Sequence, residues 1–250
     1  MVSAAPWFED EDFWREMYPA MFPPDRFAAA PGQVEQILRL TGFAGHTVLD
    51  LCCGPGRHAV CFAQHDFRVT GVDRTPFLLE RARERAAEAG VEVEWVERDM
   101  RRFERPGAFD LACSLFTSFG YFEDPEDDLR VLRNLRASLA PGGVLVIDVI
   151  SKEKVARHWQ DAFCSRLEDG TLVVQCPEVC ADWTRLRNEW TLIRDGRSKT
   201  FRFEHTIYSG RELKDRLLSA GFAAVDLYGD LEGRAYGLDA ARLVAVARNG

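Results

Sequence analysis

Hydrophobic and polar positions follow two alternating periods from residue 46 onward. Short apolar runs, typical of buried strands, are separated by longer segments with helical spacing. Residues 144–147 are apolar without interruption, as in a central strand buried on both faces. The segment from Thr75 to Glu88 begins with Thr-Pro and ends at Gly90, which predicts a helix. The pattern therefore predicts an α/β fold: a doubly wound, mostly parallel seven-stranded sheet with helices on both faces.

The predicted elements form a continuous series. The predicted strands are 47–51, 67–73, 91–96, 109–115, 143–150, 223–228 and 242–247, and the predicted helices are 57–65, 75–88, 125–139 and 211–220. Together they predict one domain over residues 46–250.

Residues 1–45 are predicted to form an N-terminal helical cap or lid. Phe13, Trp14, Met17 and Tyr18 recur at helical spacing, and the prolines that begin at Pro19 are expected to break that helix. A second helix is expected over residues 31–40.

Residues 160–208 are predicted to be an antiparallel β insertion. Strands are expected at about 172–174, 187–193 and 200–208. Asp169-Gly170 and Asp195-Gly196 are typical hairpin turns between such strands.

Composition narrows the range of functions. The formal net charge of −8 argues against nucleic acid as a partner, because phosphate binding needs a basic surface. No run approaches the ~20 apolar residues that span a bilayer, and no signal peptide is evident, so we expect a cytoplasmic protein without membrane contact. Seven cysteines without a regular framework fit free thiols in a reducing compartment. Cys176, Cys180 and His205 are a weak metal-ligand pattern, and we expect no metal.

The candidate chemistry is concentrated in the segment Asp50-Leu51-Cys52-Cys53-Gly54-Pro55-Gly56-Arg57. A strand leads into a glycine-rich turn that opens a helix, an arrangement in which backbone amides can approach a polar ligand closely. Gly54 to Ala59 also matches G-x-G-x-x-G/A, the dinucleotide pattern, and Asp73 stands where an acid would bind ribose hydroxyls. These features alone leave two classes equally open: a methyltransferase, or an oxidoreductase that uses NAD or a flavin.

Further motifs distinguish these classes. From residue 46 to the C-terminus the sequence resembles the class I S-adenosylmethionine-dependent methyltransferases, in particular bacterial small-molecule enzymes with a Rossmann-like fold. The resemblance lies in Asp50 to Gly56, in which Cys52 replaces the first motif glycine, in Gly71-Val72-Asp73, in Arg98-Asp99-Met100, in Phe109-Asp110-Leu111, and in Leu139-Ala140-Pro141-Gly142-Gly143. Several motifs in the same order and at the same spacing make the resemblance specific.

The resemblance implies S-adenosylmethionine as the cofactor and assigns roles to residues. Gly54 and Gly56 would pass close to its methionine part, Asp50 would order the turn or meet its amine, and Leu115 would lie near the methyl donor. Asp73 would bind the ribose hydroxyls, and Asp99 and Met100 the adenine. The residues implied to bind the cofactor are Asp50, Cys52, Gly54, Gly56, Asp73, Arg74, Asp99, Met100, Leu115 and Arg26. A thiol at Cys52 would be tolerated if its backbone φ angle is negative.

The implied reaction is methyl transfer to a nitrogen or oxygen of a small-molecule acceptor by in-line displacement, which needs alignment more than a base. The candidate catalytic residues are Tyr18, which would close with Arg26 over the cofactor by analogy with related enzymes, and His205 as a base. The loop 114–122 is expected to cover the acceptor pocket, and Tyr121, Tyr208 and Trp159 are possible lining residues. His158 is a second possible base. A non-catalytic protein that retained cofactor binding is a third possibility.

Overall fold

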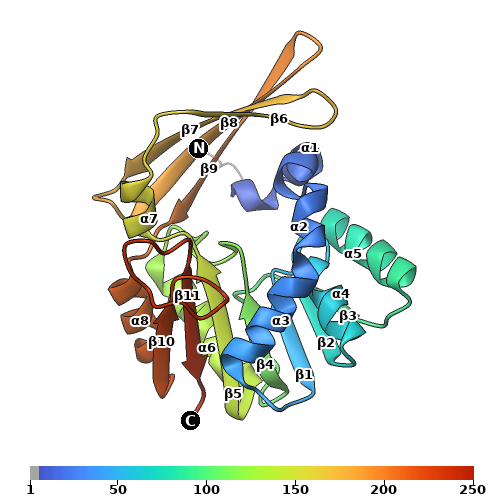
Figure 1. Cartoon of the computed structure of the whole chain (residues 1–250), viewed down its shortest axis with the longest axis vertical. Coiled ribbons are helices and arrows are strands. Elements are labelled where there is room, and N and C mark those ends of the chain that lie inside the picture. Colours follow the sequence, from blue (N-terminus) through green and yellow to red (C-terminus); the bar gives the residue numbers. More distant parts are fainter. Residues whose placement is uncertain (1–5) are drawn as a thin grey trace.

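A computed structural model describes residues 6–250 and contains two β-sheets (Figure 1). The larger sheet has seven strands in the order β10-β11-β5-β4-β1-β2-β3. All its neighbours are parallel except β11, which runs antiparallel to both β5 and β10. Its strands are β1 (Thr47–Leu51), β2 (Arg68–Asp73), β3 (Glu94–Glu97), β4 (Phe109–Ser114), β5 (Leu139–Val149), β10 (Ala224–Tyr228) and β11 (Leu243–Arg248). The predicted doubly wound, mostly parallel sheet is confirmed.

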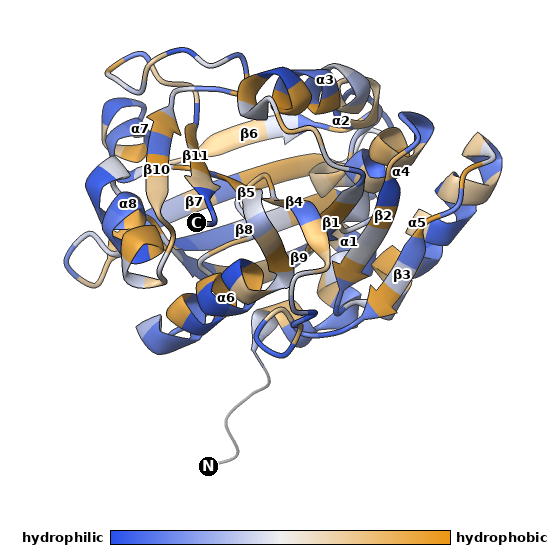
Figure 2. Ribbon diagram, turned by 90° about the horizontal axis from the view of Figure 1, so that it is seen from below, coloured by the Kyte–Doolittle hydropathy of each residue, from blue (hydrophilic) through white to orange (hydrophobic). Residues whose placement is uncertain are grey.

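Alternate residues of the central strands face two separate apolar layers. Val48 of β1 packs with helices α3 (Ala30–Thr41) and α4 (Arg57–Gln64), whereas its neighbour Leu49 belongs to the layer that contains α6 (Pro125–Ser138) and α8 (Gly210–Ser219). Figure 2 shows these helix pairs on opposite sides of the sheet, and α5 (Pro76–Ala89) lies beside α4. Because both faces are covered, the central strands read as continuous apolar runs in the sequence.

The N-terminal residues divide into a covering segment and a core helix. The covering segment, defined here as residues 7–28, contains a 3₁₀ turn η1 (Trp7–Glu9), α1 (Glu11–Met21) and α2 (Pro24–Ala28). In contrast, α3 buries Val34 and Ile37 completely against the sheet. Residues 1–5 of the expected cap lie outside the described residues.

Pro19 does not break the first helix, contrary to the sequence prediction. It lies inside α1, which continues to Met21. Proline removes one hydrogen bond from a helix interior. Burial of Phe13, Trp14 and Met17 on the other side of α1 offsets that loss.

The predicted antiparallel insertion is a separate four-stranded sheet, β6-β7-β8-β9. Its strands are β6 (Phe163–Arg166), β7 (Leu172–Cys180), β8 (Arg185–Arg194) and β9 (Arg197–Thr206). The sequence pattern predicts neither β6 nor the short helix α7 (Lys152–Arg157) before it. In Figure 1 this sheet lies above the carboxyl ends of the central strands, with α1 between.

The register of the small sheet separates the residues of the weak metal pattern. His205 pairs with Leu186, which pairs with Val179, so these three side chains share one face. Cys176 and Cys180 differ from Val179 by an odd number of positions and therefore point to the opposite face. Within residues 6–250 no group of three metal-ligating side chains converges.

None of the helices within residues 6–250 has the length and apolar character that crossing a bilayer requires.

Gly56 is required by packing where α4 begins. Its φ angle is +76°, and a Cβ atom there would lie 2.8 Å from the Trp95 ring and 2.9 Å from the Ala82 Cβ. Gly142 has the same φ of +76°, but a Cβ atom there would meet nothing within 4 Å. Substituting alanine at each of the two glycines therefore distinguishes the cost of backbone strain, which both share, from the cost of steric overlap, which only Gly56 has.

We predict that Gly56→Ala lowers the free energy of unfolding by about 1–3 kcal/mol more than Gly142→Ala, because only the first adds overpacking to the shared strain. Urea denaturation of both variants measures this difference. Equal losses would show that close packing does not select glycine at position 56.

Candidate active site at the carboxyl edge of the sheet

The glycine-rich turn leaves β1 and is held by its neighbour β2. The Cys53 amide donates to the Val72 carbonyl at 3.0 Å, and the Gly56 amide closes the turn on the Cys53 carbonyl at 3.1 Å. Gly54, at φ +54°, donates its amide to the Asp73 carboxylate at 2.9 Å. The turn is thus fixed before the first residue of α4.

Asp73 links three elements at this edge. Its other carboxylate oxygen accepts from the Thr75 amide at 2.9 Å, just before α5 begins. Burial raises the pKa of Asp73, and the amide hydrogen bonds oppose that shift. Asp73 therefore orders the turn from the end of β2.

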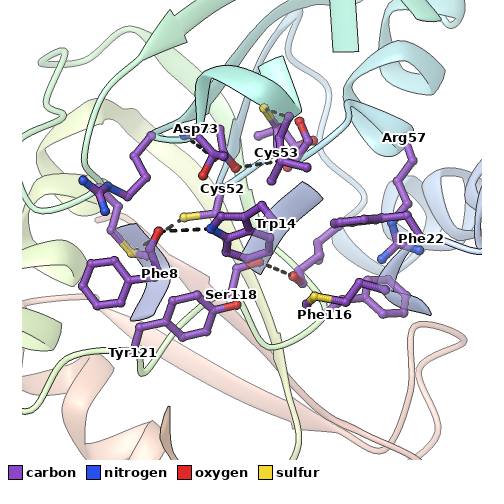
Figure 3. A pocket seen from close by; sticks show the side chains of 18 of the residues that line it. Phe8, Trp14, Phe22, Cys52, Cys53, Arg57, Asp73, Phe116, Ser118 and Tyr121 are labelled. Carbon is purple, nitrogen blue, oxygen red and sulfur yellow. Dashed lines mark hydrogen bonds between the residues drawn. The ribbon is translucent and has the colours of Figure 1, made fainter. Parts of the chain in front are cut away.

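A cavity of about 110 Å³, here called the first cavity, lies over this turn (Figure 3). The sequence-predicted residues that line it are Arg26, Asp50, Cys52, Gly54, Asp73, Arg74, Asp99, Met100 and Leu115. Gly56 and Tyr18 do not line it, and His205 lines a different cavity. Most of the implied cofactor residues, although distant in sequence, are brought together.

Asp50 lines the first cavity, and its carboxylate can still accept a hydrogen bond. Its side chain is 2 % exposed, and Oδ2 has no hydrogen-bond partner in the described structure. Burial raises the pKa of Asp50 to about 7, against the opposing effect of the Arg57 charge. A buried acceptor of this kind is suited to a cationic group such as an ammonium.

Cys52 adopts a left-handed backbone conformation, although a cysteine in place of the motif glycine was expected to be tolerated only with a negative φ angle. Its φ angle is +61°, in the region that favours the glycine of the motif. A non-glycine residue there stores about 1–3 kcal/mol of strain. The thiol lies 3.8 Å from the Met100 sulfur, and burial raises its pKa well above the ordinary value. Cys52 therefore contributes a neutral, polarizable surface to the wall.

Asp99 and Met100 line the wall nearest β3. Both Asp99 oxygens accept from the Arg101 guanidinium, at 2.6 Å for the shortest contact, and Arg101 also pairs with Asp127. Hydrogen bonds from Arg101 lower the pKa of Asp99 despite partial burial. Met100 is 8 % exposed, so it belongs both to the core and to the cavity wall.

The covering segment closes the first cavity with aromatic rings. Phe8 and Trp14 line it, and the Trp14 indole N–H donates to the Phe8 carbonyl at 3.1 Å (Figure 3). Arg74 forms an ion pair with Glu9 of the same segment at 3.2 Å. These rings explain why the cavity is smaller than the roughly 300–1,000 Å³ of typical ligand sites.

Tyr18 occupies a different place from the one its proposed role requires. Its ring packs against Phe22 and Phe77, at centroid distances of 5.3 and 5.6 Å. Arg26, its expected companion, does line the cavity and donates to the Met21 carbonyl at 2.8 Å.

Several lining residues lie outside the set that the sequence predicts. Arg57 and His58 directly follow the glycine turn, and that position could have identified them as lining residues from the sequence. Phe8 and Trp14 had no such signal, because only the folded chain brings residues 7–28 to the turn.

A second cavity, of about 410 Å³, adjoins the first and lies under the small sheet. The two share Met21, Arg26, Phe116 and Tyr121 as lining residues. Trp159, one of the possible lining residues, lines the second cavity, and so do the candidate bases His158 and His205. Tyr208 does not line it: its hydroxyl donates to the buried Asp128 at 2.5 Å.

His205 lines the second cavity and has a buried nitrogen without a partner within residues 6–250. The side chain is 7 % exposed, and Nε2 has no hydrogen-bond partner in the described structure. Burial, reinforced by Arg185, lowers the pKa of His205 to about 4. The imidazole is therefore neutral at pH 7.

Fold and site together define a class of protein. A mostly parallel sheet, a glycine turn after its first strand, and an acid at or just beyond the carboxyl end of each of the first three strands are the architecture of Rossmann-like enzymes that bind a nucleoside cofactor. The first cavity lies where ligands bind in such sheets, outside the carboxyl ends of the strands.

Comparisons with known proteins identify a methyltransferase domain in this chain. Residues 48–143 match a methyltransferase domain. An N,N-dimethyltransferase of dTDP-4-amino-2,3,4,6-tetradeoxy-D-glucose from Saccharopolyspora spinosa is 32% identical over 122 residues, 49% of this chain and 47% of that relative. An N,N-dimethyltransferase of dTDP-3-amino-3,4,6-trideoxy-alpha-D-glucopyranose from Streptomyces venezuelae is 26% identical, and the match covers 83% of this chain and 88% of that relative.

A solved S-adenosylmethionine-dependent methyltransferase from Clostridium acetobutylicum ATCC 824 has the same fold. Its TM-score is 0.80 at 15% identity, with 96% of this chain and 98% of that chain covered. Residues 48–143 therefore form a methyltransferase domain, and the chain is similar in sequence and fold to S-adenosylmethionine-dependent methyltransferases of the bacterial small-molecule type. It is an enzyme, and S-adenosylmethionine is its cofactor.

The match to a methyltransferase domain decides between the classes that the glycine turn left open. An NAD- or flavin-dependent oxidoreductase and a non-catalytic binding protein are both set aside. The residues present also fit the cofactor: Asp50 offers an unpartnered carboxylate oxygen in the wall, and Gly54 brings bare backbone to the cavity surface.

Proposed function

We propose that this enzyme methylates a nitrogen or oxygen of a small-molecule acceptor that binds in the second cavity. The observation that supports this most is the adjacency of the two cavities, which share four lining residues. Relatives named as sugar N,N-dimethyltransferases and as a ubiquinone biosynthesis O-methyltransferase are consistent with either acceptor atom.

We assign the cofactor residues by their chemistry. Asp50 holds the ammonium group of S-adenosylmethionine, and Arg26 and Arg57 face its carboxylate. Asp73 accepts from the ribose hydroxyls with the lone pairs that its two amide contacts leave, and Asp99 and Met100 bind the adenine. Arg74 anchors the covering segment through Glu9.

The bound cofactor supplies an activated methyl group, so the protein mainly aligns the acceptor. His205 stays neutral at pH 7 and can accept a hydrogen bond from an acceptor hydroxyl or amine through Nε2. With a pKa of about 4 it is a weak base, and orientation is its main contribution. Tyr18 supports the covering segment by packing and has no direct contact with the cavity.

The enzyme is proposed to act in the cytoplasm, without nucleic acid or membrane as partner. All seven cysteines are free thiols, and the acidic net charge disfavours binding to phosphate backbones.

The first test is calorimetric titration of the enzyme with S-adenosylmethionine and, separately, with NAD. We expect micromolar affinity for the first and no measurable affinity for the second. Binding of NAD alone would refute the proposal.

We predict that the affinity for S-adenosylmethionine falls about five- to tenfold between pH 7.5 and pH 6. The raised pKa of Asp50, about 7, leaves mostly neutral carboxyl at pH 6, and a neutral carboxyl cannot pair with an ammonium. Asp50→Asn should bind more weakly at both pH values and lose this pH dependence. 5′-Methylthioadenosine lacks the ammonium and serves as control: the same pH dependence for it would exclude Asp50 as the cause.

The covering segment is proposed to act as the lid of the first cavity. We predict that Trp14→Ala speeds dissociation of S-adenosylmethionine by about tenfold or more in a chase experiment, because the ring closes the cavity. Trp183→Ala is the matched control, since that indole is 48 % exposed in the turn between β7 and β8. An unchanged dissociation rate in the Trp14 variant would contradict the lid.

A further inference from the structure

The second cavity has one wall made by the small sheet. The side chains on its inner face alternate along β7, β8 and β9, and the register places Gln175 beside Trp190, Asn188 beside Phe203 and Leu186 beside His205. Trp159 and Phe163 complete the apolar part of the lining and are 39 % and 41 % exposed. Exposed aromatic side chains at the edge of a cavity are typical of a binding site.

The charges that line this cavity are all of one sign. Arg26, Lys154 and Arg242 line it, and none of its lining residues within 6–250 is an Asp or Glu. The whole chain contains 40 acidic and 32 basic residues. A cavity with only cationic charges in an acidic protein indicates a ligand that carries negative charge.

Only one of the three cations has a carboxylate partner. Arg242 donates to Asp148 at 2.6 Å, and Asp148 is 1 % exposed behind it. The Lys154 ammonium donates to the Ala241 carbonyl at 2.5 Å, a neutral acceptor. No carboxylate of the described chain lies within 4 Å of the Lys154 ammonium or the Arg26 guanidinium.

The cations also affect one another. Burial lowers the pKa of Lys154, and so does the neighbouring Arg242 charge, which outweighs the opposing effect of Asp148. Burial and Arg242 lower the pKa of Arg26 in the same way. Like charges held close together repel, and an anion placed between them would relieve that repulsion. Since Arg26 is shared with the first cavity, Lys154 and Arg242 are the cations that belong to the second.

We propose that the second cavity takes an aromatic acceptor that carries an acidic group, with its ring against Trp190 and Phe203 and its carboxylate, sulfonate or phosphate on Lys154 and Arg242. This rests on the proposed function, because the site is an acceptor site only if the methyl donor binds in the first cavity. His205 lies on the same face of the sheet and accepts from the atom to be methylated.

The binding test uses two fluorescent probes of similar shape. 1-Anilinonaphthalene-8-sulfonate carries an acid, and N-phenyl-1-naphthylamine has the same ring system without it. We expect Lys154→Gln to bind the sulfonate at least tenfold more weakly and the neutral probe unchanged, since a charge-assisted contact is lost. Lys214→Gln on α8 is the matched control because Lys214 does not line the cavity.

The apolar contact is tested separately. Trp190→Ala should weaken both probes. Equal affinity of wild type for the two probes, or an equal effect of Lys154→Gln and Lys214→Gln on the sulfonate, would overturn the proposal.

Displacement of the bound sulfonate probe identifies which kind of acidic group the second cavity prefers. 1-Naphthoate and 1-naphthyl phosphate should displace the bound sulfonate, and the stronger competitor identifies the acid, whereas 1-naphthamide should not displace it. Displacement by the amide as effectively as by the acids would overturn the charge requirement.

Calorimetry with S-adenosylmethionine separates this proposal from the proposed function. The cofactor affinity of Lys154→Gln should equal that of wild type. Loss of cofactor binding in wild type itself would refute methyl transfer, while the probe results would still decide the charge preference of the second cavity.

Discussion

The buried carboxylate of Asp73 holds together the carboxyl edge of the large sheet, where the first cavity lies. It accepts one amide from the glycine turn after β1 and another at the start of α5, each at 2.9 Å. Two strands and two helix starts thereby have fixed positions relative to one another. An acid in this place is costly to bury, as its raised pKa indicates, and the amide bonds offset that cost. The other residues at this edge, Asp50 and Cys52 among them, depend on the turn that Asp73 orders.

Strain and uncompensated charge are concentrated at the same edge. Cys52 is held at a positive φ angle, and Asp50 has a buried oxygen without a partner. Burial and the Arg26 charge lower the pKa of Arg57 to about 10, so cations repel one another between the cavities. Each feature lowers stability in the free protein, and a ligand of complementary charge would relieve the two electrostatic ones, at Asp50 and between the arginines. The apolar layers on both faces of the sheet provide the stability that makes this arrangement possible.

The covering segment and the small sheet form two adjoining cavities over the edge of the large sheet. The rings of Trp7, Phe8 and Tyr121 pack on one another beside both cavities, with centroids 4.7 Å apart for Trp7 and Tyr121. The Trp7 indole N–H also donates to the Glu204 carbonyl of β9 at 3.1 Å. The covering segment near the N-terminus is therefore hydrogen-bonded to β9 of the small sheet, so the two are mechanically coupled.

The sequence alone determined the sheet, its connections and most of the first cavity, since these follow from local periodicity and from motifs of a few neighbouring residues. The positions after β1, β2 and β3 could be placed together because the carboxyl ends of parallel strands meet at one edge. Where the sequence prediction was wrong, tertiary packing had overridden local preference: Pro19 stays within a helix whose other face is buried, and Cys52 takes a glycine-like backbone in a turn fixed by Asp73. Only the tertiary structure decided that Trp14 closes the first cavity, that Tyr18 lies away from it, and that Lys154 and Arg242 line the second. Those two cations are far apart in sequence and belong to no common motif. They come together because α7 contacts the residues just before β11, where the Lys154 ammonium donates to the Ala241 carbonyl.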